Sequence, residues 1–172
     1  MRNVLMAALL PLVAACQSMH GDGPRASATL EPTKGSTVRG NATFMQHGDK
    51  VHVMASVSGL KPNGEFGFHV HEAGDCSSGD GMSTKGHFNP HNKPHAQAGM
   101  AERHAGDLPS LKSDASGNAK LHAEVDIISV APGPASIVGR GLIVHAQPDD
   151  YKTQPTGNAG ARSACAVIQR AS

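Results

Sequence analysis

The chain has 172 residues, enough for one domain with a real core, and its 15 Lys and Arg residues almost balance its 14 Asp and Glu residues. This near-neutral charge argues against a nucleic-acid partner, which would need a basic stripe on the surface. Four Phe, one Tyr and no Trp leave the core to small aliphatic side chains, and 20 Gly with 11 Pro indicate frequent turns. The 11 His residues are a large excess, and their spacing decides which of them point to function.

An export signal is predicted over residues 1–16. Arg2 supplies a positive charge, and the mostly apolar run 4–15 that follows is too short to span a bilayer as a stable helix. The run ends in Val13-Ala14-Ala15-Cys16, which resembles the lipobox of bacterial lipoproteins, where the cysteine is acylated and becomes the first mature residue. Ordinary cleavage after a nearby small residue is the alternative. Acylation of Cys16 would leave Cys76 and Cys165 as an even pair.

Residues 17–25 are polar and predict a flexible tether, and the folded domain is predicted over residues 26–172. In the segment 51–58, Val51, Val53, Ala55 and Val57 alternate with His52, Met54, Ser56 and Ser58, which is the period of a half-buried strand. Gly48-Asp49 separates this run from an earlier one at 38–46 and predicts a hairpin. The further strand candidates are 64–72, 121–126 (after a turn at 116–118), 139–146 and 164–169. Many short strands, without helical periodicity outside the signal, predict an antiparallel sandwich or barrel.

Two long segments, 73–108 and 147–163, show no clear strand pattern. Loops of this length in a compact domain are usually functional or disordered. Metal ligands would give the first loop its order, because it contains a cluster of potential ligands, namely Cys76, His87, His91, His95, His104 and Asp107.

His69 and His71 lie at i and i+2 on one predicted strand, so both side chains point to the same face. Phe68 and Val70 point to the other face, toward the core. Such a strand offers a pair of metal ligands, although exposed polar alternation gives the same pattern.

His87, His95, His104 and Asp107 provide three imidazoles and one carboxylate, a set that suits a tetrahedral zinc ion. His145 comes at the end of the later strand 141–145. With His69 and His71 it would complete an all-imidazole site, which suits copper better than harder cations. A plain zinc-binding module is the alternative for the whole set.

Four segments resemble, in their order, the motifs of the copper,zinc superoxide dismutase family. They are Gly67-Phe68-His69-Val70-His71-Glu72, Gly86-His87-Phe88-Asn89-Pro90, His104-Ala105-Gly106-Asp107-Leu108-Pro109 and Gly157-Asn158-Ala159-Gly160-Ala161-Arg162. The resemblance runs from about residue 26 to the C-terminus. The position of Cys76, well before His87 in an enlarged loop, resembles the bacterial periplasmic branch of that family. Ala96 and Ala161 are small departures that remove neither a ligand nor a charge.

The resemblance implies an eight-stranded antiparallel Greek-key barrel, an immunoglobulin-like sandwich with two long functional loops. It also implies a role for each matched residue. His69, His71 and His145 would bind copper, His87 would bridge copper and zinc, and the zinc site would be completed by His95, His104 and Asp107. Asp149 would orient one copper-binding and one zinc-binding imidazole, and Cys76 and Cys165 would form a disulfide. His87 and Arg162 would be catalytic, with Arg162 guiding the anionic substrate. No role is assigned to His20, His47, His52, His91 and His122. His52 and His122 alternate with apolar residues and are predicted to lie on solvated faces, and His91 is predicted to lie at the surface.

The implied activity is that of an enzyme converting two superoxide radicals to dioxygen and hydrogen peroxide by alternating reduction and oxidation of a copper ion, with a zinc ion beside it. Such an enzyme would protect the cell envelope from superoxide. The alternative is a non-catalytic envelope protein that binds copper or zinc on the same fold. The expected location is the periplasm, with membrane attachment through an acylated Cys16. The expected assembly is a monomer or a homodimer without nucleic acid.

Overall fold

The computed structural model describes residues 23–171. The predicted export signal, Cys16 and His20 therefore lie outside the described residues. Within these residues, no helix has the length and apolar character needed to cross a membrane.

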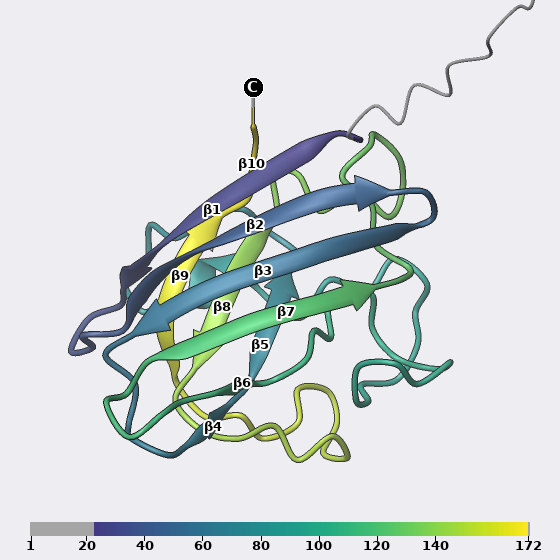
Figure 1. Cartoon of the computed structure of the whole chain (residues 1–172). Helices are drawn as coiled ribbons and strands as arrows, with labels where there is room; N and C mark the ends of the chain where they lie inside the picture. The colour runs from purple at the N-terminus through teal and green to yellow at the C-terminus, as the bar shows by residue number, and fades with distance from the viewer. Residues whose placement is uncertain (1–22, 172) are drawn as a thin grey trace, which may run out of the picture.

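An antiparallel sheet of eight strands curls into a half-barrel, which confirms the predicted all-β fold. The strand order is β5-β8-β9-β1-β2-β3-β7, and β10 pairs with β1 beside this path. Figure 1 shows β1, β2, β3 and β7 as one layer, with β5, β8 and β9 crossing behind it. A separate pair is formed by β4 and β6. The strands are β1 (Arg25–Pro32), β2 (Arg39–His47), β3 (Lys50–Ser58), β4 (Glu65–Phe66), β5 (Phe68–His71), β6 (Leu111–Lys112), β7 (Ala119–Val125), β8 (Gly141–His145), β9 (Arg162–Val167) and β10 (Gln169–Arg170).

The predicted hairpin is confirmed in β2 and β3, which pair from Arg39↔Ser58 to His47↔Lys50. Val51, Val53 and Val57 are buried because alternate side chains of β3 point between the two layers. Phe44 enters the same core from β2, and Met54 lies on the outer face with 42% of its surface exposed. The core is aliphatic with few aromatic rings, as the composition predicted.

Three other strand candidates are found close to their predicted bounds, as β7, β8 and β9. The candidate at 64–72 is divided into β4 and β5 by Gly67. A Cβ at Gly67 would lie 2.8 Å from the Cβ of Ala159 and 3.0 Å from Cε1 of His69, so a larger residue would disturb the site. Strand β1 gave a weak signal in the sequence because two of its three buried side chains are those of Ala26 and Ala28.

The two predicted functional loops connect β5 to β6 (residues 72–110) and β8 to β9 (residues 146–161). The first contains a single turn of 3-10 helix at Met82–Thr84. The predicted disulfide is present and joins Cys76 in this loop to Cys165 in β9, across 89 residues of sequence. The disulfide therefore holds the first loop against β9, and the second loop is held near β5 by the hydrogen bond from Gly67 N to the carbonyl of Gln147.

Candidate metal centre

Strand β5 places His69 and His71 side by side at the edge of the sheet, and the 72–110 loop covers this edge. Val70 N donates to the carbonyl of Gly106, and Phe88 N donates to the carbonyl of Val70, at 2.9 and 2.8 Å. A Cβ at Gly106 would lie 2.2 Å from the Val70 oxygen, so this close approach requires glycine. The backbone of the loop thus brings His87 and Asp107 to the strand that carries the first two histidines.

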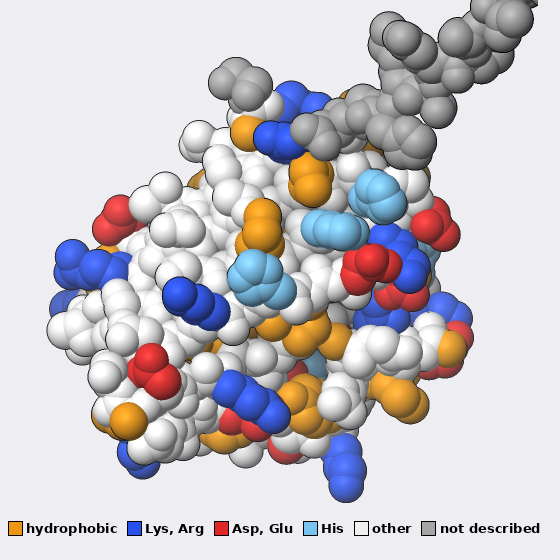
Figure 2. All heavy atoms as spheres, in the orientation of Figure 1, with side chains coloured by type: hydrophobic (Ala, Val, Ile, Leu, Met, Phe, Trp, Pro, Cys, Tyr) orange, Lys and Arg blue, Asp and Glu red, His pale blue; other side chains and the backbone are white. Residues whose placement is uncertain are grey.

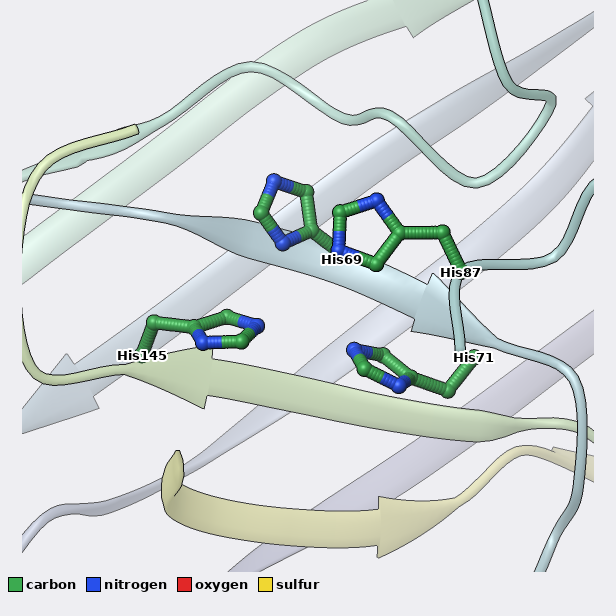
Figure 3. Close-up of side chains that lie close together, drawn as sticks. All are labelled: His69, His71, His87 and His145. Atoms are coloured by element: carbon green, nitrogen blue, oxygen red, sulfur yellow. The ribbon is translucent and has the colours of Figure 1, made fainter. Parts of the chain in front are cut away.

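Four buried imidazoles converge from β5, the loop and the end of β8, as Figure 3 shows. Their ring centroids lie 4.9 Å apart for His69 and His145, 5.1 Å for His71 and His87, and 5.7 Å for His71 and His145. One donor atom from each residue lies within 4.8 Å of the others. The predicted copper set His69, His71, His87 and His145 is thus confirmed as one cluster.

The hydrogen bonds of this copper set leave one nitrogen of each ring free for a metal. His71 Nδ1 donates to the carbonyl of Lys85 at 2.9 Å, and His145 Nδ1 donates to that of Gly160 at 3.2 Å. Since a carbonyl can only accept, Nε2 of both rings must carry a lone pair. Within the copper set, the buried nitrogens without a hydrogen-bond partner are His69 Nδ1 and Nε2 of His71, His87 and His145. Four unpartnered lone pairs in a buried cluster fit a copper ion.

The predicted zinc set is a second buried cluster on the other side of His87, formed by His87, His95, His104 and Asp107. Oδ1 of Asp107 lies 2.9 Å from Nδ1 of His87, 3.0 Å from Nδ1 of His95 and 3.5 Å from Nδ1 of His104. Backbone amides of Ala96 and His104 donate to its Oδ2 and fix the carboxylate. Because the main chain makes the bond at Ala96, this departure from the family pattern is harmless. Three imidazoles and one carboxylate fit zinc.

His87 belongs to both clusters. Its Nδ1 faces Asp107 in the zinc set, and its Nε2 is the atom that it contributes to the copper set. The backbone bridge between His71 and His87 fixes the ring between the two sets. This arrangement matches the predicted bridging role.

Asp149 connects one imidazole of each set. His69 Nε2 donates to its Oδ2 at 2.7 Å, and His95 Nε2 donates to its Oδ1 at 2.9 Å. A Cβ at Gly157 would lie only 1.8 Å from Oδ1 of Asp149, and the residue has a φ of +66°, so the loop requires glycine here. The carboxylate lies where an orienting acceptor is needed for a metal-binding imidazole.

Gln154 holds His95 through its main chain, a role that the sequence did not predict. Its Oε1 accepts a hydrogen bond from His95 N at 2.8 Å, and its Nε2 donates to His95 O at 2.8 Å. No motif singled out Gln154, because the bond depends on how two distant loops meet. The only available signal was its place in the 147–163 segment.

Burial favours the neutral form of three imidazoles in the copper set. It lowers the pKa of His87 to about 4 and that of His145 to about 3, and it lowers the pKa of His71 well below its ordinary value. At His95 burial acts the same way, but the carboxylates of Asp107 and Asp149 outweigh it and raise the pKa to about 9. Neutral rings at physiological pH keep their lone pairs available to a metal.

Arg162 lies beside the copper set and is bonded to the segment 81–85. Its Nη1 donates to Gly81 O and to Thr84 Oγ1, each at 2.7 Å, and its Nη2 donates to Lys85 O at 2.6 Å. Lys85 O is also the acceptor for His71 Nδ1. After burial and neighbouring imidazoles, the positive charge of Arg162 also lowers the pKa of His71 and His145. The guanidinium thus supplies a fixed charge at the site and also supports the loop.

The remaining described histidines lie outside both sets. His47, His91 and His122 are exposed, and His52 is partly exposed. For His52 and His122 this agrees with the alternation along their strands, which predicted solvated faces.

Comparison with known proteins assigns the same chemistry. Residues 38–168 match the family model described as copper/zinc superoxide dismutase. Superoxide dismutase [Cu-Zn] 2 of Aquifex aeolicus (strain VF5) is 37% identical over 149 residues, which cover 84% of this chain and 86% of that protein. Superoxide dismutase [Cu-Zn] of Paramecium bursaria Chlorella virus 1 is 41% identical over 137 residues, 76% of this chain and 72% of that protein. The crystal structure of the clock protein EA4 superposes on this chain with a TM-score of 0.77 at 45% sequence identity, covering 84% of this chain and 93% of that chain.

Proposed function

We propose that this chain, which belongs to the copper/zinc superoxide dismutase family and is a Cu-Zn superoxide dismutase, works in the bacterial cell envelope. There it would protect the cell from superoxide. The enzymatic activity rests on one observation above all, that two complete donor sets share His87. A protein that only carried one of the metals would need neither the second set nor the shared imidazole.

Copper bound by the four imidazoles supplies the one-electron chemistry that converts superoxide to dioxygen and hydrogen peroxide. The chain positions the groups around that chemistry. We propose that His87 takes up and delivers a proton at Nε2 whenever this nitrogen does not bind copper, because that atom faces the copper set while Nδ1 is fixed on the zinc side. Asp149 orients His69 and His95, and Arg162 supplies positive charge for a small anion.

A superoxide-decay assay on the metal-loaded protein tests this function. Activity should vanish when copper alone is removed and return when copper is restored. Protein that keeps zinc and lacks copper should be inactive, because zinc has no redox chemistry. Activity that survived complete removal of copper would contradict the proposed function.

The envelope location is supported by the sequence of residues 1–16 and by the Cys76–Cys165 disulfide. Structural disulfides persist in oxidising compartments such as the periplasm and are rare in the cytosol. The proposed subtype is therefore an exported bacterial enzyme anchored through an acylated Cys16. Several acyl chains on one residue would hold the protein firmly, whereas one chain is marginal.

Replacement of Cys16 by Ser tests the anchor separately from the activity. We expect Cys16→Ser to move the protein from the membrane fraction to the soluble envelope fraction, with unchanged turnover for each bound copper. Mass spectrometry of the wild-type N-terminus should find an acylated Cys16. A mature N-terminus beyond residue 16, or unmodified Cys16 in the membrane fraction, would refute the anchor and leave the enzyme assignment intact.

A further inference from the structure

One imidazole outside the two metal sets shares the property that distinguishes the copper set. Among the described residues, the buried side-chain nitrogens without a hydrogen-bond partner are the four of the copper set, Arg103 Nε and His52 Nε2. The His52 side chain is 39% exposed, but its Nε2 is shielded from solvent. This nitrogen faces the carboxylate of Glu124 at 3.3 Å, too poorly aligned to count as a hydrogen bond.

A second imidazole lies beside it. His52 in β3 pairs across the strands with Met45 in β2, and His47 lies two residues further along β2, so both histidines point to the outer face. Their ring centroids are 5.3 Å apart with the planes tilted by 58°. The His87–His104 and His71–His145 pairs, which each belong to a metal set, are 5.4 and 5.7 Å apart. The two rings are thus about as close as rings that share a metal set. Among the described residues, only the two buried sets bring three or more donor atoms within 4.8 Å of one another, so the side chains on this outer face must turn toward one another to bind one ion.

The third donor comes from β7, where Glu124 is the cross-strand partner of His52. Glu124 Oε1 binds Lys50 Nζ at 2.7 Å, and Oε2 is turned toward His52. The pKa of Glu124 is held below its ordinary value, mainly by Lys50 and to a smaller extent by the two histidines. Glu124 is therefore a carboxylate at neutral pH. Figure 2 shows histidine side chains gathered on this outer face beside acidic and basic groups.

We propose that His47, His52 and Glu124 form a third metal site, for a late first-row divalent cation such as Zn²⁺ or Cu²⁺. Two imidazoles and one carboxylate are donors of the class that these cations prefer, and a fourth position would remain open to solvent. Because the site lies at the surface and offers three protein ligands, it binds more weakly than the two buried sets of four. Lys50 is a competing cation for Glu124, so the charge of Lys50 opposes metal binding.

Isothermal titration of Zn²⁺ into metal-loaded protein, with both buried sets filled and excess metal removed, tests the site. We expect one further equivalent to bind to the wild type. His47→Ala, His52→Ala and Glu124→Gln should each weaken it by at least about tenfold, the loss that even an outer partner of a metal ligand commonly causes. Lys50→Met should strengthen it by removing the competing charge. Superoxide turnover should be the same in every variant, since none of these residues belongs to either buried set.

His122→Ala is the matched control, because His122 is an exposed histidine on the same face whose cross-strand partner is Met54. It should leave the additional binding unchanged. Proton resonances of the His47 and His52 rings should shift with the added Zn²⁺, and that of His122 should not. The proposal is overturned if the wild type takes up no further metal, if His122→Ala loses as much affinity as His52→Ala, or if Lys50→Met weakens binding.

Discussion

At the residue scale, Arg162 combines a charge with a structural contact. Its guanidinium lies close enough to the copper set to lower the pKa of His71 and His145, and it also binds the segment 81–85. We expect Arg162→Ala to slow turnover by about tenfold if the lost attraction for superoxide is ~1.4 kcal/mol. Arg162→Lys should recover part of the rate, because lysine keeps the positive charge but lacks the several N–H donors of the planar guanidinium. Arg162→Glu should be slower than Arg162→Ala.

Turnover for these variants is measured at low and high ionic strength, with metal content determined each time. Salt should slow the wild type more than Arg162→Ala, because the screened attraction is already missing in the variant. Lys112→Ala is the control, since it removes one positive charge from an exposed position on β6. Equal rates for all four residues at position 162, at matched copper content, would show that this arginine does not guide the substrate.

Asp149 carries the second prediction at this scale. In Asp149→Asn an NH2 group replaces one of the two carboxylate oxygens. This group cannot accept a hydrogen bond, so His69 or His95 loses its acceptor. We expect zinc retention against a chelator to fall by about 10- to 100-fold, with an unchanged circular dichroism spectrum. Asp150→Asn is the control, because the neighbouring Asp150 only caps the exposed turn at Lys152 and Thr153. Equal zinc retention in both variants would mean that the carboxylate of Asp149 does not support the metal.

At the scale of the secondary-structure elements, a contact could be predicted from the sequence when its two partners lie close together along the chain. The hairpin of β2 and β3 could be predicted because its alternation and its turn are both local. Most donor residues could be named because the His-X-His strand and short motifs carry them, whereas His145 lies far along the chain and could be named only from its place at the end of a strand and from the family resemblance. The contacts of Gln154 with His95 and of Arg162 with Lys85 could not be predicted, since they join segments 59 and 77 residues apart. They depend on the path of loops whose conformation no periodic pattern encodes.

The disulfide is the second anchor of the loop that Arg162 holds. Cys165 and Arg162 both belong to β9, and both bind the part of the 72–110 loop that precedes His87. Closing 89 residues constrains the unfolded chain by roughly 4–5 kcal/mol in the chain-entropy model. We expect the double variant Cys76→Ser with Cys165→Ser to melt at a lower temperature and to lose copper to a chelator faster than the wild type. An unchanged melting temperature and an unchanged rate of copper loss would contradict this role.

At the scale of the whole molecule, the metal centre brings together, inside one half-barrel, histidines whose pKa is lowered and a histidine whose pKa is raised. Burial lowers the pKa of His71, His87 and His145, whereas Asp107 and Asp149 raise that of His95 to about 9. Despite their burial, both carboxylates have a pKa held well below the ordinary value by hydrogen bonds from the imidazoles. The stability of the metal-free protein should therefore depend on pH in a way that an ordinary β-sandwich would not show.

In the folded protein the pKa of His71 is lowered, that of His87 is lowered to about 4 and that of His145 to about 3. Between pH 6.5 and about 4 these three histidines therefore become protonated in the unfolded chain while they stay neutral in the folded protein. Their contribution to the free energy of unfolding is complete above pH 6.5 and is lost as the pH falls, by roughly 1 kcal/mol for each histidine and each pH unit. His95 has the opposite sign: its contribution is complete below pH 6.5 and is lost as the pH rises through about 9, so it adds no slope in this window. The carboxylates lose their contribution only below the ordinary pKa of 3.8.

We therefore expect the free energy of unfolding of the metal-free protein, measured by urea denaturation at several pH values, to decrease steadily from pH 6.5 to pH 4. His145→Gln should flatten that slope, because it removes one of the three histidines whose pKa is lowered, while His122→Gln on the exposed face should leave it unchanged. In the metal-loaded protein the loss should be steeper, because protons and metals compete for the same nitrogen lone pairs and acid releases the metals as well. A metal-free protein with equal stability at pH 6.5 and pH 4, or a His145→Gln variant with the wild-type slope, would show that burial of the neutral imidazoles does not govern the response to acid.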